Sequence, residues 1–100
     1  MKPGKKDVRL DVLITGEELR ALQQHTWLMA EAFGLDGRIE RYKGTRPIGL
    51  YRWDLDCLLD VLAVVLEYRP AYPDPDSPER AALERLRSRL QAEYNNAFGR

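Results

Sequence analysis

Basic and aromatic side chains alternate in residues 37–53, and these residue types could recognise a ligand. Five basic residues stand there against Glu40 alone, which gives the stretch a net charge of +4. Arginine and lysine attract phosphates, and aromatic rings beside them stack on unpaired bases, the combination used to bind single-stranded nucleic acid. The stretch therefore predicts a nucleic-acid contact formed by Arg38, Arg41, Lys43, Arg46, Tyr51, Arg52 and Trp53.

These basic residues have a second interpretation that requires no ligand. The next stretch, residues 54–69, carries four acidic residues against one arginine, a net charge of −3. Charge patterns on helix faces often reflect solvated or internally paired side chains. The whole chain has a net charge of zero, which works against phosphate affinity. The sequence therefore favours arginines that face this acidic stretch, with the aromatic rings packed inward.

No residue pattern typical of catalysis or metal binding stands out. His25 is the only histidine, and no acid and nucleophile accompany it at a recognisable spacing, so we expect it at a surface or interface. Asp56 and Asp60 are one helical turn apart, but a hard cation requires further oxygen ligands. The sequence has no glycine-rich phosphate loop, nucleophile motif or zinc-ligand spacing. We therefore expect no enzyme activity, no catalytic residue, no cofactor and no metal.

A helix over residues 55–68 is the element around which the rest of the chain must be organised. At ~100° per residue, apolar side chains cover nearly the whole wheel and the acidic ones share an arc of about 40°. The helix is too short for a bilayer, which requires about 20 apolar residues, so the sequence predicts a buried central helix. We expect Asp54 to cap it. We also expect Asp60 and Glu67 to be exposed and the core to contain Leu58, Leu59, Leu62, Val65 and Leu66.

Two elements precede this helix. Residues 7–14 alternate apolar and polar side chains, which is the period of a half-buried strand. Thr15 and Glu18 stand three residues apart, as in a capping box, so we expect a helix to begin after Thr15. Gly34 can adopt the left-handed conformation that ends many helices. The first helix is therefore predicted to end at about Phe33.

That first helix carries apolar side chains on a second face, beside the stripe that it needs for the core. Small side chains on a helix allow another helix to approach closely, which suits a two-fold self-contact. Leu13 adds an apolar side chain on the polar face of the preceding strand. The sequence therefore predicts a protein interface formed by Leu13, Ala21, His25, Leu28 and Ala32.

The remaining segments complete an α+β fold. Residues 38–42 and 47–51 suit the two strands of a hairpin around a glycine-bearing loop. Residues 70–78 contain four prolines, which predict a stiff connector within the domain, and Ser77 with Pro78 then starts a C-terminal amphipathic helix. We therefore expect a small three-stranded antiparallel sheet, formed by the first strand and the hairpin, packed with the buried central helix and the C-terminal helix.

Length and composition indicate one globular domain over residues 1–100. An apolar fraction of 44% and a charged fraction of 32% are ordinary for such a domain. Residues 1–6 are expected to be a flexible N-terminus. The N-terminal stretch is basic and lacks the apolar run of a signal peptide. Cys57 has no second cysteine to pair with, so we expect a reducing cytoplasm and no membrane association.

Two functions from different classes remain open. The sequence favours a small cytoplasmic, non-catalytic protein-interaction module with a regulatory or accessory role, which self-associates as a homodimer or other homo-oligomer. The alternative is a nucleic-acid-binding regulator that uses the basic aromatic hairpin over residues 38–53. Solution mass tests the first function, and salt-dependent oligonucleotide binding tests the second.

Overall fold

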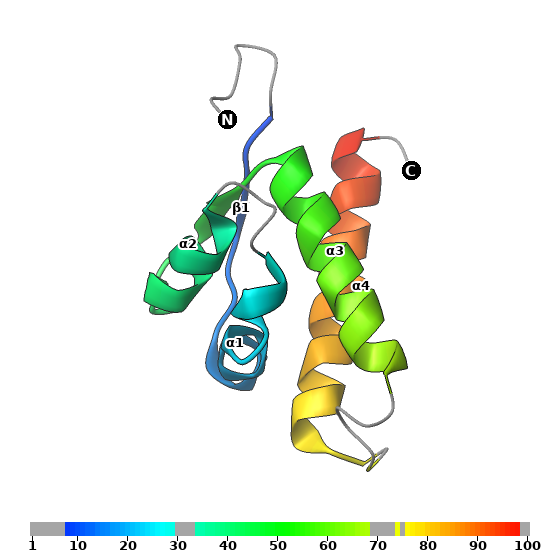
Figure 1. Cartoon of the computed structure of the whole chain (residues 1–100). Helices are drawn as coiled ribbons and strands as arrows, with labels where there is room; N and C mark the ends of the chain where they lie inside the picture. Colours follow the sequence, from blue (N-terminus) through cyan, green and yellow to red (C-terminus); the bar gives the residue numbers. More distant parts are fainter. Residues whose placement is uncertain (1–7, 30–33, 69–73, 75, 99–100) are drawn as a thin grey trace.

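Two long helices, α3 (Arg52–Glu67) and α4 (Pro78–Phe98), run antiparallel and pack side by side along one side of the molecule (Figure 1). The computed structural model describes residues 8–29, 34–68, 74 and 76–98. The other described elements are β1 (Leu10–Val12), α1 (Gly16–Gln23), a 3₁₀ turn η1 (Thr26–Met29), α2 (Leu35–Arg41) and β2 (Ile48–Leu50). The result is a small, mostly helical α+β globule, in which α1 packs against α4 and η1 contacts α2 and α3.

Helix α3 supplies much of the core, as the sequence predicts. Asp60 and Glu67 are exposed, and four of the five expected core residues are buried: Leu58, Leu62, Val65 and Leu66. Leu59 is only partly buried, and Val64 is exposed. The prediction that α3 hides every face except its acidic one is therefore wrong, because α4, η1 and the sheet cover only part of its surface.

Helix α3 begins three residues earlier than expected, at Arg52. Its N-cap is Tyr51, and Asp54 occupies the third helical position. The Tyr51 N–H donates to Asp54 Oδ2 at 3.0 Å. Asp54 was predicted as the N-cap itself, which is wrong, but its carboxylate still stabilises the helix start by reaching back to an otherwise unpaired N–H group.

The sheet has two strands in the described part of the chain, and the predicted third strand is wrong. Strand β1 pairs antiparallel with β2, in the register Leu10↔Leu50, Asp11↔Gly49 and Val12↔Ile48. Most of the expected strand at residues 38–42 lies in α2 instead. Leu35 and Ile39 stand four residues apart and are both fully buried, and that spacing puts them on one helical face. No hairpin forms, because β2 pairs with the distant β1.

Helix α1 is also shorter than predicted. It ends at Gln23 and is followed by η1, while residues 30–33, where its end was expected, lie outside the described residues. Gln23 Nε2 donates to the carbonyl oxygens of Ile39 and Tyr42, each at 3.1 Å. The Thr26 hydroxyl lies 2.7 Å from Glu40 Oε1. These bonds hold the end of α1 and η1 against α2. Gly34 has the predicted left-handed conformation (φ 92°), but it begins α2.

Thr15 precedes α1 as predicted, yet its side chain makes no capping hydrogen bond. The predicted capping box does not form, because the Glu18 carboxylate pairs with Arg89 of α4.

Thr15→Ala should therefore change the free energy of unfolding by less than about 0.5 kcal/mol. Gly16 has φ +57° with open space around it, so Gly16→Ala should cost about 1–2 kcal/mol through backbone strain alone. Urea denaturation of both variants checks the pair. A larger loss for Thr15→Ala than for Gly16→Ala would show that the Thr15 hydroxyl does cap the helix.

Helix α4 begins as predicted. The Arg80 N–H donates to Ser77 Oγ at 3.4 Å, and Pro78 is the first helical residue. The i,i+4 pair Arg80–Glu84 forms at 3.0 Å. The predicted flexible N-terminus (residues 1–6) and most of the predicted connector (residues 70–78) lie outside the described residues. No helix in the described ranges has the length and apolarity needed to cross a membrane.

Candidate functional site

Side chains from three separate segments line an open surface hollow of about 500 Å³ where β1, α2 and β2 meet. Four of its residues are arginines, and two are tyrosines. The full lining is Arg9, Arg38, Arg41, Tyr42, Arg46, Pro47, Ile48, Gly49 and Tyr51. We call this feature the arginine hollow.

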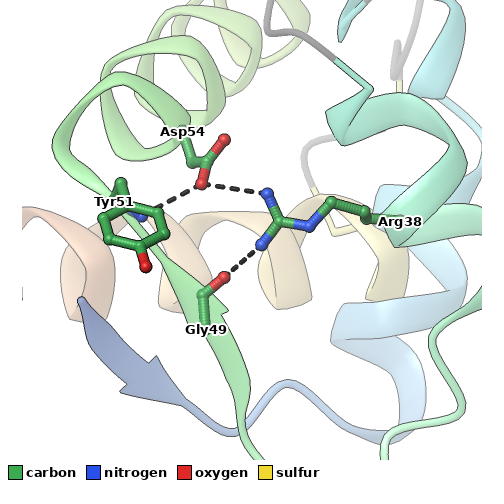
Figure 2. Close-up of polar contacts among 4 residues, drawn as sticks. All are labelled: Arg38, Gly49, Tyr51 and Asp54. Carbon is green, nitrogen blue, oxygen red and sulfur yellow. Dashed lines mark hydrogen bonds and ion pairs between the residues drawn. The ribbon is translucent and has the colours of Figure 1, made fainter. Parts of the chain in front are cut away.

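Arg38 lines the arginine hollow and is held in place by contacts with Asp54 and Gly49 (Figure 2). Its Nη1 lies 3.1 Å from Asp54 Oδ2, and its Nη2 donates to the carbonyl oxygen of Gly49. These contacts tie α2 to β2 and to the first turn of α3. A guanidinium group has five N–H donors, and the side chain of Arg38 remains 36% exposed. Its other donors are therefore available to a ligand.

Asp54 is almost completely buried, with 1% of its surface exposed. Its Oδ2 accepts from both Arg38 and the Tyr51 N–H, whereas its Oδ1 has no hydrogen-bond partner among the described residues. A buried carboxylate is costly unless it is paired with a cation. We therefore expect Arg38 to stabilise the fold as well as line the hollow, and its two contacts fix the orientation of the guanidinium group.

Arg9, which directly precedes β1, reaches the hollow by crossing Gly49 of β2. A Cβ atom at Gly49 would stand 2.6 Å from Cδ of Arg9, so the glycine leaves room for the arginine side chain. Arg9 Nε also lies 3.2 Å from Asp11 Oδ1, and both side chains are more than half exposed. Sequence reasoning missed Arg9, because its place beside residues 38–51 depends on a strand pairing between distant segments.

Arg41 and Arg46 are the two arginines of the hollow that have no carboxylate within ion-pair distance in the described ranges. Both side chains are exposed. Tyr42 lies between them in the sequence, and its hydroxyl donates to the carbonyl oxygen of Arg46 at 2.6 Å and accepts the Ile14 N–H at 3.4 Å. These bonds anchor the end of the loop that carries Arg46 to the end of β1.

An aromatic pair borders the hollow. The rings of Tyr51 and Trp53 are stacked, with centroids 5.0 Å apart and planes 12° from parallel. Tyr51 lines the hollow, and both side chains are half-buried. The prediction that the aromatic side chains pack wholly inward is therefore not met at these two residues. Tyr51 thus stands among the arginines that line the hollow.

Three of the predicted nucleic-acid residues, Lys43, Arg52 and Trp53, do not line the hollow. Arg52 points to α4, where its Nε donates to the Tyr94 hydroxyl at 3.1 Å and its guanidinium lies over the Tyr94 and Phe98 rings. Lys43 is exposed on the loop but does not line the hollow. The structure thus brings together Arg38, Arg41, Arg46 and Tyr51 from the predicted set, with Trp53 stacked behind Tyr51.

The described residues of the predicted protein interface do not share one exposed surface. Ala21 is 1% exposed and belongs to the core, and Leu28 packs partly against it. His25 is half-buried, and this burial lowers its pKa. Leu13 is exposed, while Ala32 lies outside the described residues. The strip was expected on one continuous helix, but α1 ends at Gln23 and Ala21 is buried in the core.

A larger hollow lies between α3 and α4, but its charges are matched. Arg80 there pairs with Glu84 and donates to the carbonyl oxygen of Leu66 at 2.8 Å. In the described ranges, no group of three His, Cys, Asp or Glu residues could hold a metal ion.

Comparisons with protein-family models, curated proteins and solved structures find no match to this chain. The chemistry that the arginine hollow offers is the binding of anionic groups.

Proposed function

We propose that this chain is a non-catalytic module that binds single-stranded nucleic acid in the arginine hollow. The observation that carries the proposal is the convergence of Arg9, Arg38, Arg41 and Arg46 from three segments of the chain onto one hollow. Guanidinium groups bind phosphate oxygens through paired N–H donors. Four of them around one open site suit consecutive phosphates of a flexible strand.

The arrangement of charges supports a ligand over internal neutralisation. The sequence favoured arginines that face the acidic residues of the central helix. Among the described ion pairs, only that of Arg38 with Asp54 involves an acidic residue of the central helix. The exposed acidic residues Asp60 and Glu67 form none of these ion pairs. Arg41 and Arg46 therefore keep their charge available, and a phosphate would displace no internal partner from either of them.

The aromatic pair favours nucleic acid over an acidic protein segment. A base can stack on an aromatic ring whatever its identity, and each such contact contributes about 1–3 kcal/mol. Tyr51 stands at the rim of the arginine hollow, with Trp53 stacked against it. Carboxylates of an acidic peptide would use the arginines but would gain little from the rings. Single strands are favoured because their bases are free to stack.

Binding of a fluorescent oligothymidylate, measured by anisotropy between about 50 and 200 mM salt, tests the proposal. With four phosphate contacts, the slope of log affinity against log salt should be roughly −3, from ~0.7 per contact. The double variant Arg41→Gln/Arg46→Gln should flatten the slope by about 1.4. A matched control is Arg20→Gln/Arg85→Gln, which removes the same charge from exposed sites elsewhere and should change the slope little.

Tyr51→Ala separates stacking from charge. It should weaken binding at every salt concentration by about 1–3 kcal/mol without changing the slope, provided that circular dichroism shows a folded protein. Absence of binding by the wild type at low salt would overturn the proposal. So would equal binding of an oligoglutamate peptide together with no effect of Tyr51→Ala, which would identify an acidic protein partner instead.

A further inference from the structure

The small sheet has one closed edge and one open edge in the described part of the chain. A two-stranded sheet leaves an outer edge on each strand, where unpaired backbone groups can accept another strand. The outer edge of β2 is closed. Pro47 has no N–H, the Gly49 carbonyl accepts from Arg38, and the Tyr51 N–H donates to Asp54.

The outer edge of β1 is open at Asp11. The Gly49 carbonyl points to Arg38 and so faces away from β1, which makes Asp11↔Gly49 a non-hydrogen-bonded pair of the ladder. The Asp11 N–H and carbonyl therefore point outward. The Ile14 N–H, bonded to Tyr42, and the Leu13 carbonyl, bonded to Arg89, fit the same alternation. No described residue bonds to the outward backbone groups of Asp11.

We propose that β1 pairs antiparallel with β1 of a second copy of this chain, about a two-fold axis at Leu10. The paired strands would form a four-stranded sheet in the order β2-β1-β1-β2. This register places Arg9 opposite Asp11 of the second copy, and Asp11 opposite its Arg9. Directly opposed unlike charges stabilise a strand pair, and like charges destabilise it. A two-fold axis at Asp11 would instead place the Asp11 residues of the two copies opposite each other. That register is disfavoured because the two carboxylates repel.

The exposed apolar side chain of Val8 supports the same register. Val8 is 49% exposed, although the alternation puts it on the side of Leu10 and Val12. In the proposed pairing Val8 lies opposite Val12 of the second copy, and the two Leu10 residues lie opposite each other. At the other end, Arg89 already occupies the Leu13 carbonyl, so the pairing stops there. The contact is therefore short and smaller than the ~1,200–2,000 Å² of stable complexes, which makes the dimer weak.

The dimer is inferred from backbone pairing and does not rest on the nucleic-acid proposal, although Arg9 also lines the arginine hollow. Sedimentation velocity of the full chain up to about 1 mM should show a concentration-dependent dimer. Arg9→Asp makes both charges of the edge negative, and Asp11→Arg makes both positive. The dimer dissociation constant of each variant alone should rise at least roughly tenfold, because both opposed charge pairs become repulsive. An equimolar mixture of the two should recover the dimer, since each opposed pair is again unlike.

Both positions are exposed, so both variants should keep the wild-type circular dichroism spectrum. Arg20→Asp, on the exposed side of α1, is the control and should dimerise like the wild type. A wild type that stays monomeric at about 1 mM would overturn the proposal. A dimer that both variants retain would also overturn it, by placing the contact on another surface. Arg20→Asp carries the same net charge as Arg9→Asp, so a dimer that Arg20→Asp keeps and Arg9→Asp loses distinguishes the proposed edge from a general effect of net charge.

Discussion

Leu62→Ala is expected to lower the free energy of unfolding by about 2–5 kcal/mol. Leu62 lies in the middle of α3 with 1% of its surface exposed, within a core that also contains the α4 residues Leu83, Leu86 and Leu90. Truncation removes apolar contacts and leaves a cavity between two helices that cannot close fully. Equilibrium unfolding in urea, monitored by circular dichroism, measures the change.

Val64→Ala is the matched control for this prediction. Val64 lies two residues along the same helix, but it is exposed. Its truncation should change the free energy of unfolding by less than about 0.5 kcal/mol. A loss below about 1 kcal/mol for Leu62→Ala, or equal losses at the two positions, would contradict the assignment of α3 as the centre of the core.

Arg38→Gln is expected to cost on the order of 3 kcal/mol, at the lower end for a broken buried ion pair. The substitution leaves the Asp54 carboxylate buried without a cation, and it removes the donor to the Gly49 carbonyl. Solvent reaches part of the Arg38 side chain, which moderates the loss. Arg41→Gln, at an exposed arginine of the same hollow, should change stability by less than about 1 kcal/mol.

A double-mutant cycle with Asp54→Asn isolates the ion pair from the other contacts of each residue. Asp54→Asn leaves Arg38 partly exposed to water, and an amide oxygen can still accept the Tyr51 N–H. The double variant should therefore lose clearly less stability than the sum of the two single losses. Additive losses would show that Arg38 and Asp54 are not energetically coupled.

The longest helices could be predicted because their signals are local. The apolar residues of α3 recur with the helical period, and most of its predicted core side chains are buried. The start of α4 is encoded by two adjacent residues, because Ser77 accepts the Arg80 N–H and Pro78 is the first helical residue. Such patterns act between neighbours in the sequence, so they do not depend on where the rest of the chain lies.

Shorter segments were predicted less well because their local preferences are ambiguous. Residues 38–42 have apolar side chains at Ile39 and Tyr42, a spacing that a helix or an irregular strand can both accommodate. Burial of Leu35 with Ile39 selects the helix. Ala21 was placed on an outward strip because α1 was expected to continue as one helix. Bonds from Gln23 and Thr26 to α2 end that helix early.

The sequence by itself determined a charged and aromatic stretch, a buried central helix and three of the four arginines of the candidate site. Only the tertiary structure decided which of them meet. The pairing of β1 with β2 brings Arg9 across Gly49 to the arginines of α2 and the following loop, although they are about 30 residues apart in the sequence. The same pairing leaves the outward edge of β1 open. Strand pairing between distant segments is decided by the packing of the whole core, which local propensity does not encode.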